Sequence, residues 1–276
     1  MELKLLDLFS GIGGFSYAAE RIVGGYETTQ FVEIDSYCQS VLRKNFPNTP
    51  IHDDIKTFSA KPGQFDVFTV GFPCQDLSVA GRQRGINDET RSGLFYESIR
   101  LLREVRPRFA LFENVRNLLS HGKGETFQEV LFQIAKAGYD AEWSVISAKD
   151  LGACHLRERI WILAYTNCYG SPSTEGLQVD GEADSNTQEG QNKISEFKGS
   201  SKSKNSRAIQ HSPKWQNTKH KLDPNWRGYV SESSLCRGDD GLSNRVARIK
   251  ALGNSIVPNC AAVPLQRIKD LNEELW

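Results

Sequence analysis

Cys74 stands where a cysteine could act as a nucleophile. In the stretch TVGFPCQDLSVAG, strand-forming residues stop at Pro73, and Cys74 enters a polar turn. Free cysteine often serves as a small buried hydrophobe, so a structural role is one interpretation. The other is a thiolate held at the rim of a sheet, where it could attack a substrate. The residues that end the neighbouring strands bear on this choice.

Acidic side chains follow three other predicted strands. Glu33 ends the second strand, Asp53 and Asp54 end a third, short apolar step at HDDI, and Glu113 closes the apolar segment FALFENV. A buried carboxylate is costly unless it is paired or neutralised, so Glu113 is unusual there, although a helix cap or a surface turn would also explain it. Because the carboxyl ends of parallel strands meet at one edge, we expect these residues and Cys74 to form one ligand-binding rim.

A glycine-rich turn, FSGIGGF, follows the first predicted strand. Gly11, Gly13 and Gly14 let the backbone turn tightly and approach a ligand closely, but the third glycine of the G-x-G-x-x-G dinucleotide pattern is missing. Glu33 lies about 20 residues further on, at the end of the next strand, where its carboxylate could accept hydrogen bonds from both hydroxyls of a ribose. The glycine turn and Glu33 together predict a cofactor that contains adenosine without a pyrophosphate.

Two arginines, Arg157 and Arg159, begin the segment RERIWILA and its predicted strand. Because alternate residues of a strand face the same side, we expect the two guanidinium groups to point together. A solvated edge would explain the same pattern.

These residues need a sheet to position them. Apolar runs alternate with helical patterns over the first 165 residues, which predicts a doubly wound, mostly parallel α/β sheet. The helical patterns are GLFYESIRLLREV and TFQEVLFQIAKAG, with a last helix over roughly Cys260 to Leu275. The predicted strands are Leu3 to Phe9, Thr28 to Asp35, Phe65 to Phe72, Arg108 to Val115, Trp143 to Asp150 and Arg159 to Tyr165.

The composition is that of a soluble globular protein with a substantial core. The chain has 276 residues, 38% hydrophobic content and a formal net charge of zero. No stretch approaches the length of a membrane span and the first residues have no signal-peptide pattern, so we expect a cytoplasmic protein. The six cysteines are scattered without a CxxC pair, which argues against a disulfide framework and against a zinc or other metal site.

A polar segment, about 167–222, interrupts the globular pattern. Its second half, 193–221, carries eight Lys or Arg against one acidic residue. It is either a solvated insertion or a phosphate-contacting surface that becomes ordered on binding.

The motifs DLFSGIGGF, GFPCQDLSVAG, FENVRNLL, RERIWILA and ALGNSIVP occur in that order. Together they resemble the DNA (cytosine-5) methyltransferases, in the short form found in bacteria and prophages. The resemblance runs from Leu5 to Ala164 and again from Arg245 to about Leu265. It implies a Rossmann-like methyltransferase sheet with a small, polar target-recognition region. The implied layout is a catalytic domain at 1–165, target recognition at 166–244 and a C-terminal segment at 245–276 that packs beside the first strand.

The resemblance also implies S-adenosyl-L-methionine as methyl donor. Cys74 would be the nucleophile, Glu113 would contact N3 and the exocyclic amine of cytosine, and Arg157 and Arg159 would belong to the cytosine pocket, with Arg159 on O2. The implied cofactor-binding residues are Phe9, Gly11, Gly13, Gly14, Glu33, Asp54, Ile55, Pro73, Leu94, Asn254 and Ser255.

Duplex DNA is the implied partner of a monomeric enzyme, and a separately acting restriction endonuclease is left open. The target base would be flipped out of the duplex, with Ser78, Arg82 and Arg84 on the DNA and the loop 81–89 as a candidate lid. His155 departs from the glutamine that the family usually has there. The alternatives are a tRNA cytosine-5 methyltransferase, which shares these motifs, and a catalytically silent binding module.

Overall fold

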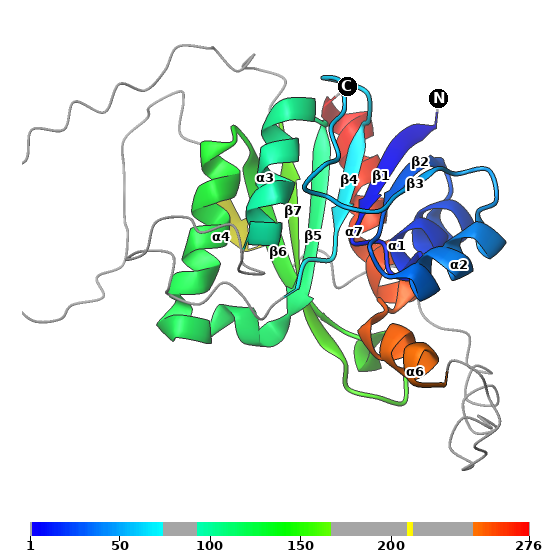
Figure 1. Ribbon diagram of the computed structural model, residues 1–276. Coiled ribbons are helices and arrows are strands. Elements are labelled where there is room, and N and C mark those ends of the chain that lie inside the picture. Colours follow the sequence, from blue (N-terminus) through cyan, green and yellow to red (C-terminus); the bar gives the residue numbers. More distant parts are fainter. Residues whose placement is uncertain (1, 74–92, 167–208, 212–244, 276) are drawn as a thin grey trace, which may run out of the picture.

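A single twisted sheet forms the centre of the protein (Figure 1). The computed structural model describes residues 2–73, 93–166, 209–211 and 245–275. The order of the strands is β3-β2-β1-β4-β5-β7-β6-β8, and β7 runs antiparallel to both of its neighbours while the other pairs are parallel. The strands are β1 Leu3–Leu8, β2 Tyr26–Val32, β3 Ile51–His52, β4 Val67–Val70, β5 Phe109–Val115, β6 Asp140–Ser147, β7 Glu158–Tyr165 and β8 Ile209–His211.

Helices cover both faces of this sheet, which confirms the predicted doubly wound, mostly parallel fold. Helices α3 and α4 lie on one face, and α7 lies behind the sheet (Figure 1). The α-helices are α1 Gly14–Tyr17, α2 Ser36–Asn45, α3 Gly93–Val105, α4 Glu125–Lys136, α6 Arg245–Asn254 and α7 Pro258–Leu275. The π-helical turn η1 Ala18–Val23 continues α1, and short 3-10 helices are η4 Arg116–Leu119, η5 His121–Gly124 and η6 Lys149–Leu151.

The two hydrophobic clusters follow from strand alternation. Leu5 of β1 packs in the cluster that contains α1, η1 and α7, whereas its neighbour Leu6 packs in the cluster under α3 and α4. Successive side chains of a strand point to opposite faces, so a strand buried on both faces is apolar at nearly every position. Tyr26 also donates its hydroxyl to the carbonyl of Leu265 at 2.6 Å, which fixes α7 to the sheet.

Two predicted strands are displaced towards the N-terminus in the structure. The strand expected at Thr28 to Asp35 is β2, Tyr26–Val32, so Glu33 follows it rather than lying in it. The segment expected at Trp143 to Asp150 begins at Asp140 and ends at Ser147. Helix α4 ends before Gly138, whose φ of 100° reverses the chain at once, so the strand starts earlier. Its early residue Glu142 is buried and pairs with Arg267 of α7 at 3.1 Å, which offsets the cost of burying the carboxylate.

Asp7 is a fully buried carboxyl group near the end of β1. Ser16 donates its hydroxyl to one oxygen and Thr69 to the other, both at 2.8 Å, so Asp7 joins β1 to α1 and β4. Burial raises the pKa of Asp7 to about 7, against the lowering effect of these hydrogen bonds.

This pKa makes stability depend on pH. The folded protein holds the Asp7 proton more tightly than the unfolded chain, whose carboxyl has a pKa near 3.8. The stabilisation is complete below pH 4 and is lost as the pH rises towards 7. We expect the unfolding free energy of the wild type to fall, relative to Asp7→Asn, by about 1.4 kcal/mol per pH unit over that range. Urea unfolding at four pH values measures this slope.

Asp53→Asn is the matched control, because the Asp53 carboxylate is solvent-exposed. Its stability should follow that of the wild type at every pH. An Asp7→Asn profile parallel to that of the wild type would contradict the expectation.

Candidate active site

The candidate site lies at the edge formed by the carboxyl ends of β1, β2, β4 and β5. The strand order reverses at β1: β2 and β3 lie on one side of it, and β4 and β5 lie on the other. Open α/β sheets bind ligands at the carboxyl ends of the strands where the order reverses in this way. Because β7 is antiparallel, its first residues reach the same edge: Arg159 lies opposite Val115.

The glycine turn after β1 uses backbone conformations that L side chains rarely adopt. Phe9 and Gly11 have φ of 55°, and Gly13 has φ of 87°. A Cβ atom on Gly14 would lie 3.2 Å from both the Cβ and the carbonyl oxygen of Ile256. The turn therefore packs closely against the segment that carries Asn254 and Ser255, which the resemblance assigns to the same cofactor set.

Glu33 follows β2 and holds this turn. Its Oε2 accepts the N–H of Gly11 at 2.7 Å, and its Oε1 accepts the N–H of Asp35 at 2.8 Å. Each oxygen keeps capacity for a second hydrogen bond, so the carboxylate can still accept a ligand hydroxyl. Ile34, beside it, is 75% exposed, a residue that the sequence reasoning missed. The feature of the sequence that could have identified Ile34 is an apolar residue between two acidic residues at the end of a strand.

Asp35 connects the segment after β2 to α6. Its carboxylate caps the N-terminus of α2 by accepting the N–H groups of Tyr37 and Cys38, and it pairs with Lys250 of α6 at 3.2 Å. The hydrogen bond from the Cys38 N–H is the main cause that lowers the pKa of Asp35. The sequence reasoning also missed this link.

Asp54 and Ile55 lie in the loop after β3, at the same edge. The loop starts beside Glu33, whose N–H donates to the carbonyl of His52 at 2.9 Å. Ile55 is buried in the cluster against which Leu94, in the first turn of α3, also packs. The structure thus brings this part of the predicted cofactor set together, while Pro73 lies exposed after β4.

Glu113 and Arg159 form an ion pair at the ends of β5 and β7. The register places Glu113 opposite Trp161, so Arg159, two residues away, projects from the same face as its diagonal neighbour. The distance from Arg159 Nε to Glu113 Oε1 is 2.9 Å, and the Glu113 side chain is only 12% exposed. Burial raises the pKa of Glu113, while the charges of Arg159 and Arg157 oppose the shift. The site therefore holds a carboxyl group that can take up a proton more readily than one in water.

Arg157 differs from the prediction, because β7 begins at Glu158 and Arg157 precedes it. Its guanidinium donates to the carbonyls of Gly253 at 3.0 Å and Ser255 at 2.7 Å, at the end of α6. Burial and the charge of Arg159 lower the pKa of Arg157. Both arginines and His155 line one open hollow of about 580 Å³, so the side chains do converge, although their partners differ.

Asn114 brings the ends of β4 and β5 together. Its amide Nδ2 donates to the carbonyl of Phe72 at 3.0 Å, and its Oδ1 accepts the N–H of Val115 at 2.8 Å. Phe72 is followed in the sequence by Pro73 and by Cys74, the predicted nucleophile. The contact therefore holds the end of β4 beside the end of β5, which carries Glu113. The sequence reasoning quoted Asn114 within its motif but gave it no role.

Several predicted residues lie outside the described part of the chain. They are the nucleophile Cys74, the DNA contacts Ser78, Arg82 and Arg84, the loop 81–89 and, apart from Thr166 and β8, the region 166–244. Among the described residues, no group of three or more His, Cys, Asp or Glu could hold a metal ion. In the same residues, no helix is both long and apolar enough to cross a membrane.

Comparisons with known proteins identify a family model and several relatives that the chain resembles. The family model described as C-5 cytosine-specific DNA methylase matches residues 3–241. The Type II methyltransferase M.DsaV of Dactylococcopsis salina is 38% identical over 164 residues, which are 59% of this chain and 46% of that protein. The Type II methyltransferase M.HhaI of Haemophilus parahaemolyticus is 35% identical over 165 residues, which are 60% of this chain and 50% of that protein. The chain spans about half the length of these curated relatives.

A solved structure agrees on the fold. The S. pombe Dnmt2 methyltransferase is similar with a TM-score of 0.52 and 24% identity, covering 62% of this chain and 53% of that one.

The Glu113–Arg159 pair supplies a prediction about stability. Arg159→Met leaves a mostly buried carboxylate without its ion-pair partner, so we expect a loss of roughly 3 kcal/mol in unfolding free energy at pH 8. The loss should be smaller at pH 5, because the pKa of Glu113 rises further and the group takes up a proton. Adding Glu113→Gln should restore part of the stability, as chemical denaturation will measure.

Arg116→Met is the control, since Arg116 pairs with Glu158 at 2.7 Å but is 60% exposed. An exposed pair contributes about 1 kcal/mol or less. Equal losses in the two single variants would show that burial does not set the cost.

Proposed function

The chain belongs to the C-5 cytosine-specific DNA methylase family, and from that premise we propose that it transfers a methyl group from S-adenosyl-L-methionine to C5 of cytosine in duplex DNA. The observation that carries the proposal is the Glu113–Arg159 ion pair. Asn114, the residue after Glu113, donates a hydrogen bond to Phe72, which precedes Pro73 and Cys74 in the sequence. An acid and a cation at one sheet edge, with a cysteine directly after Pro73 in the sequence, are the groups that addition to a pyrimidine needs.

The residues of the rim fit S-adenosyl-L-methionine. We propose that Glu33 accepts hydrogen bonds from the ribose hydroxyls, since one oxygen is held by the N–H of Gly11, the other by the N–H of Asp35, and each keeps capacity for a second hydrogen bond. The positive-φ turn over Phe9, Gly11 and Gly13 would let the backbone approach the ligand. The adenine would lie between apolar side chains, for which the exposed Ile34 and the Ile55 loop are suited. The remaining proposed contacts are Gly14, Asp54, Pro73, Leu94, Asn254 and Ser255.

The donor supplies an electrophilic methyl group, and the protein activates the base. The Cys74 thiolate adds to C6 of cytosine, which moves electron density towards N3 and makes C5 nucleophilic. Glu113, with its raised pKa, donates a proton or hydrogen bond at N3 and accepts one from the exocyclic amine. Arg159 binds O2. Methyl transfer would form the bond from C5 to the methyl carbon and break the sulfur–methyl bond of the donor. C5 would then lose its proton to water, the electron pair of that C–H bond would re-form the C5–C6 double bond, and the bond from C6 to the cysteine sulfur would break to release the thiolate.

Arg157 belongs to the same proposed pocket. Because its guanidinium is engaged by the carbonyls of Gly253 and Ser255, it joins the proposed cofactor segment to the cytosine side.

The target base has to leave the duplex before this chemistry can occur. We propose that Ser78, Arg82 and Arg84 contact DNA, and that residues 166–244 read the sequence. The basic stretch within that region suits contacts to phosphates.

The first test is covalent trapping on duplex DNA that contains 5-fluorocytosine. Fluorine at C5 cannot leave as a proton, so the adduct should persist on a denaturing gel when S-adenosyl-L-methionine is present. Cys74→Ser should give no adduct and no methyl transfer, while calorimetry should find its affinity for S-adenosyl-L-methionine unchanged. Adduct formation by Cys74→Ser would contradict the mechanism.

The same gel distinguishes a DNA substrate from a tRNA substrate. No adduct on DNA but an adduct on fluorinated tRNA would replace the proposal with a tRNA methyltransferase. Cofactor binding without any adduct would indicate a silent binding module.

Glu113→Gln tests the acid. We expect the rate of a single turnover to fall by about 100-fold or more, because the amide cannot deliver a proton to N3. The affinity for S-adenosyl-L-methionine should stay within about twofold of the wild type, since Glu113 is not among the proposed cofactor contacts. A wild-type rate would remove Glu113 from the mechanism.

A further inference from the structure

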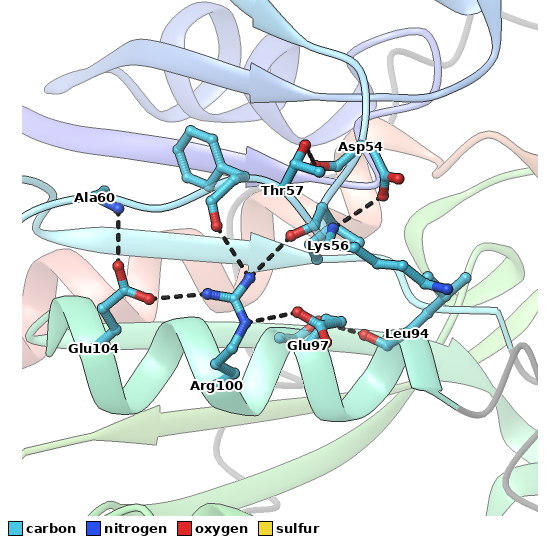
Figure 2. A network of polar contacts seen from close by, with 11 residues as sticks. Asp54, Lys56, Thr57, Ala60, Leu94, Glu97, Arg100 and Glu104 are labelled. Atoms are coloured by element: carbon cyan, nitrogen blue, oxygen red, sulfur yellow. Dashed lines mark hydrogen bonds and ion pairs between the residues drawn. The ribbon is translucent and has the colours of Figure 1, made fainter. Parts of the chain in front are cut away.

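Arg100 sits at the centre of a polar network between α3 and the loop after β3 (Figure 2). Its Nη2 donates to two backbone carbonyls of that loop, Ile55 and Phe58, both at 3.0 Å. Its Nε donates to Glu97 at 2.6 Å, and its Nη1 donates to Glu104 at 2.9 Å. The guanidinium thus joins two acids of its own helix to a segment more than 40 residues earlier in the chain.

Glu104 adds a third attachment to the loop. The oxygen that does not bind Arg100 accepts the N–H of Ala60 at 3.2 Å. The loop is therefore held at residues 55, 58 and 60 by one arginine and one glutamate of α3. Thr57 and Phe58 also donate their N–H groups to the carbonyl of Asp54, so the attached segment forms a compact turn.

The ion pairs alone do not explain this arrangement. Arg100 is 37% exposed, and pairs between residues three or four apart on a helix surface contribute little. The contacts to the two carbonyls are different, because they satisfy backbone acceptors in a segment without regular secondary structure. A planar guanidinium can serve several acceptors in fixed directions, which a lysine ammonium cannot do.

The loop that Arg100 holds carries Asp54 and Ile55, two of the proposed cofactor contacts. Its start is fixed beside Glu33 by the hydrogen bond from Glu33 to His52, and Ile55 shares a hydrophobic cluster with Leu94. Arg100 lies on the same helix as Leu94, two turns away. One side chain thus fixes the position of the loop relative to the helix that carries the other contact.

We infer that Arg100 is a positioning residue for the methyl donor: it holds the loop 54–60 in the conformation that binds S-adenosyl-L-methionine, without touching the ligand. The inference rests on the proposed function. The apparent dissociation constant of a ligand rises in inverse proportion to the fraction of protein in the binding-competent state. If the released loop is competent about a tenth of the time, the dissociation constant rises about tenfold.

The experiment compares Arg100→Met with Arg103→Met. Arg103 is on the same helix, and its guanidinium donates to Gln133 at 3.1 Å, away from the loop. We expect Arg100→Met to raise the dissociation constant and the KM for S-adenosyl-L-methionine about tenfold. Its kcat at saturating cofactor should stay within about twofold of the wild type. Arg103→Met should match the wild type in each quantity.

The split between KM and kcat separates positioning from general damage. A variant that merely unfolds in part loses active molecules, so its kcat falls while its KM stays the same. Hydrogen exchange gives a second readout: the amides of Thr57, Phe58 and Ala60 should exchange faster in Arg100→Met. A lower kcat with wild-type KM, or equal effects in the two methionine variants, would overturn the inference.

Arg100→Lys provides a second route if Arg100→Met does not fold. Lysine keeps the positive charge near Glu97 and Glu104 but cannot bind both carbonyls and both acids together. We expect weakened cofactor binding here too, and wild-type affinity would overturn the inference. Failure of the wild type itself to bind S-adenosyl-L-methionine in calorimetry would instead refute the proposed function, so the two failures are distinguishable.

Discussion

The antiparallel pairing of β7 with β5 is the constraint on which the site depends. In a wholly parallel sheet the first residues of β7 would lie at the opposite edge, far from the carboxyl ends of β1 and β4. Because β7 runs in the opposite direction, Arg159 lies at the edge where Glu113 follows the apolar residues of β5. Because a carboxylate that is largely buried needs a partner, the same pairing also makes Glu113 tolerable in the fold.

The side of the edge that carries the proposed cofactor contacts follows a related rule, since its carboxylates are oriented by backbone N–H groups. Glu33 receives the N–H groups of Gly11 and Asp35, and Asp35 in turn caps α2. These bonds hold the acids rigid while leaving acceptor capacity on their oxygens. Preorganisation of this kind means that a ligand need not order the side chains that it meets.

Sequence patterns predicted the elements well where local periodicity and burial agree. Helix α3 occupies the predicted segment Gly93–Val105, because its apolar residues keep a helical spacing throughout. The displaced start of β6 escaped prediction because Glu142 depends on Arg267, which lies 125 residues further on. The rim residues could be inferred from their places after strands, but their partners could not. Neither the carbonyls bound by Arg157 nor those bound by Arg100 leave a local pattern in the sequence.

Arginine recurs at this edge for a geometric reason. Loops and helix ends leave backbone carbonyls without regular partners, and a guanidinium can satisfy two of them while its charge is balanced elsewhere. Arg157 does this for the end of α6, and Arg100 does it for the loop after β3. Both segments carry proposed cofactor contacts, so the positions of those contacts depend on arginines that are not themselves placed on the cofactor. Replacement of either arginine by lysine would keep the charge and still lose the geometry.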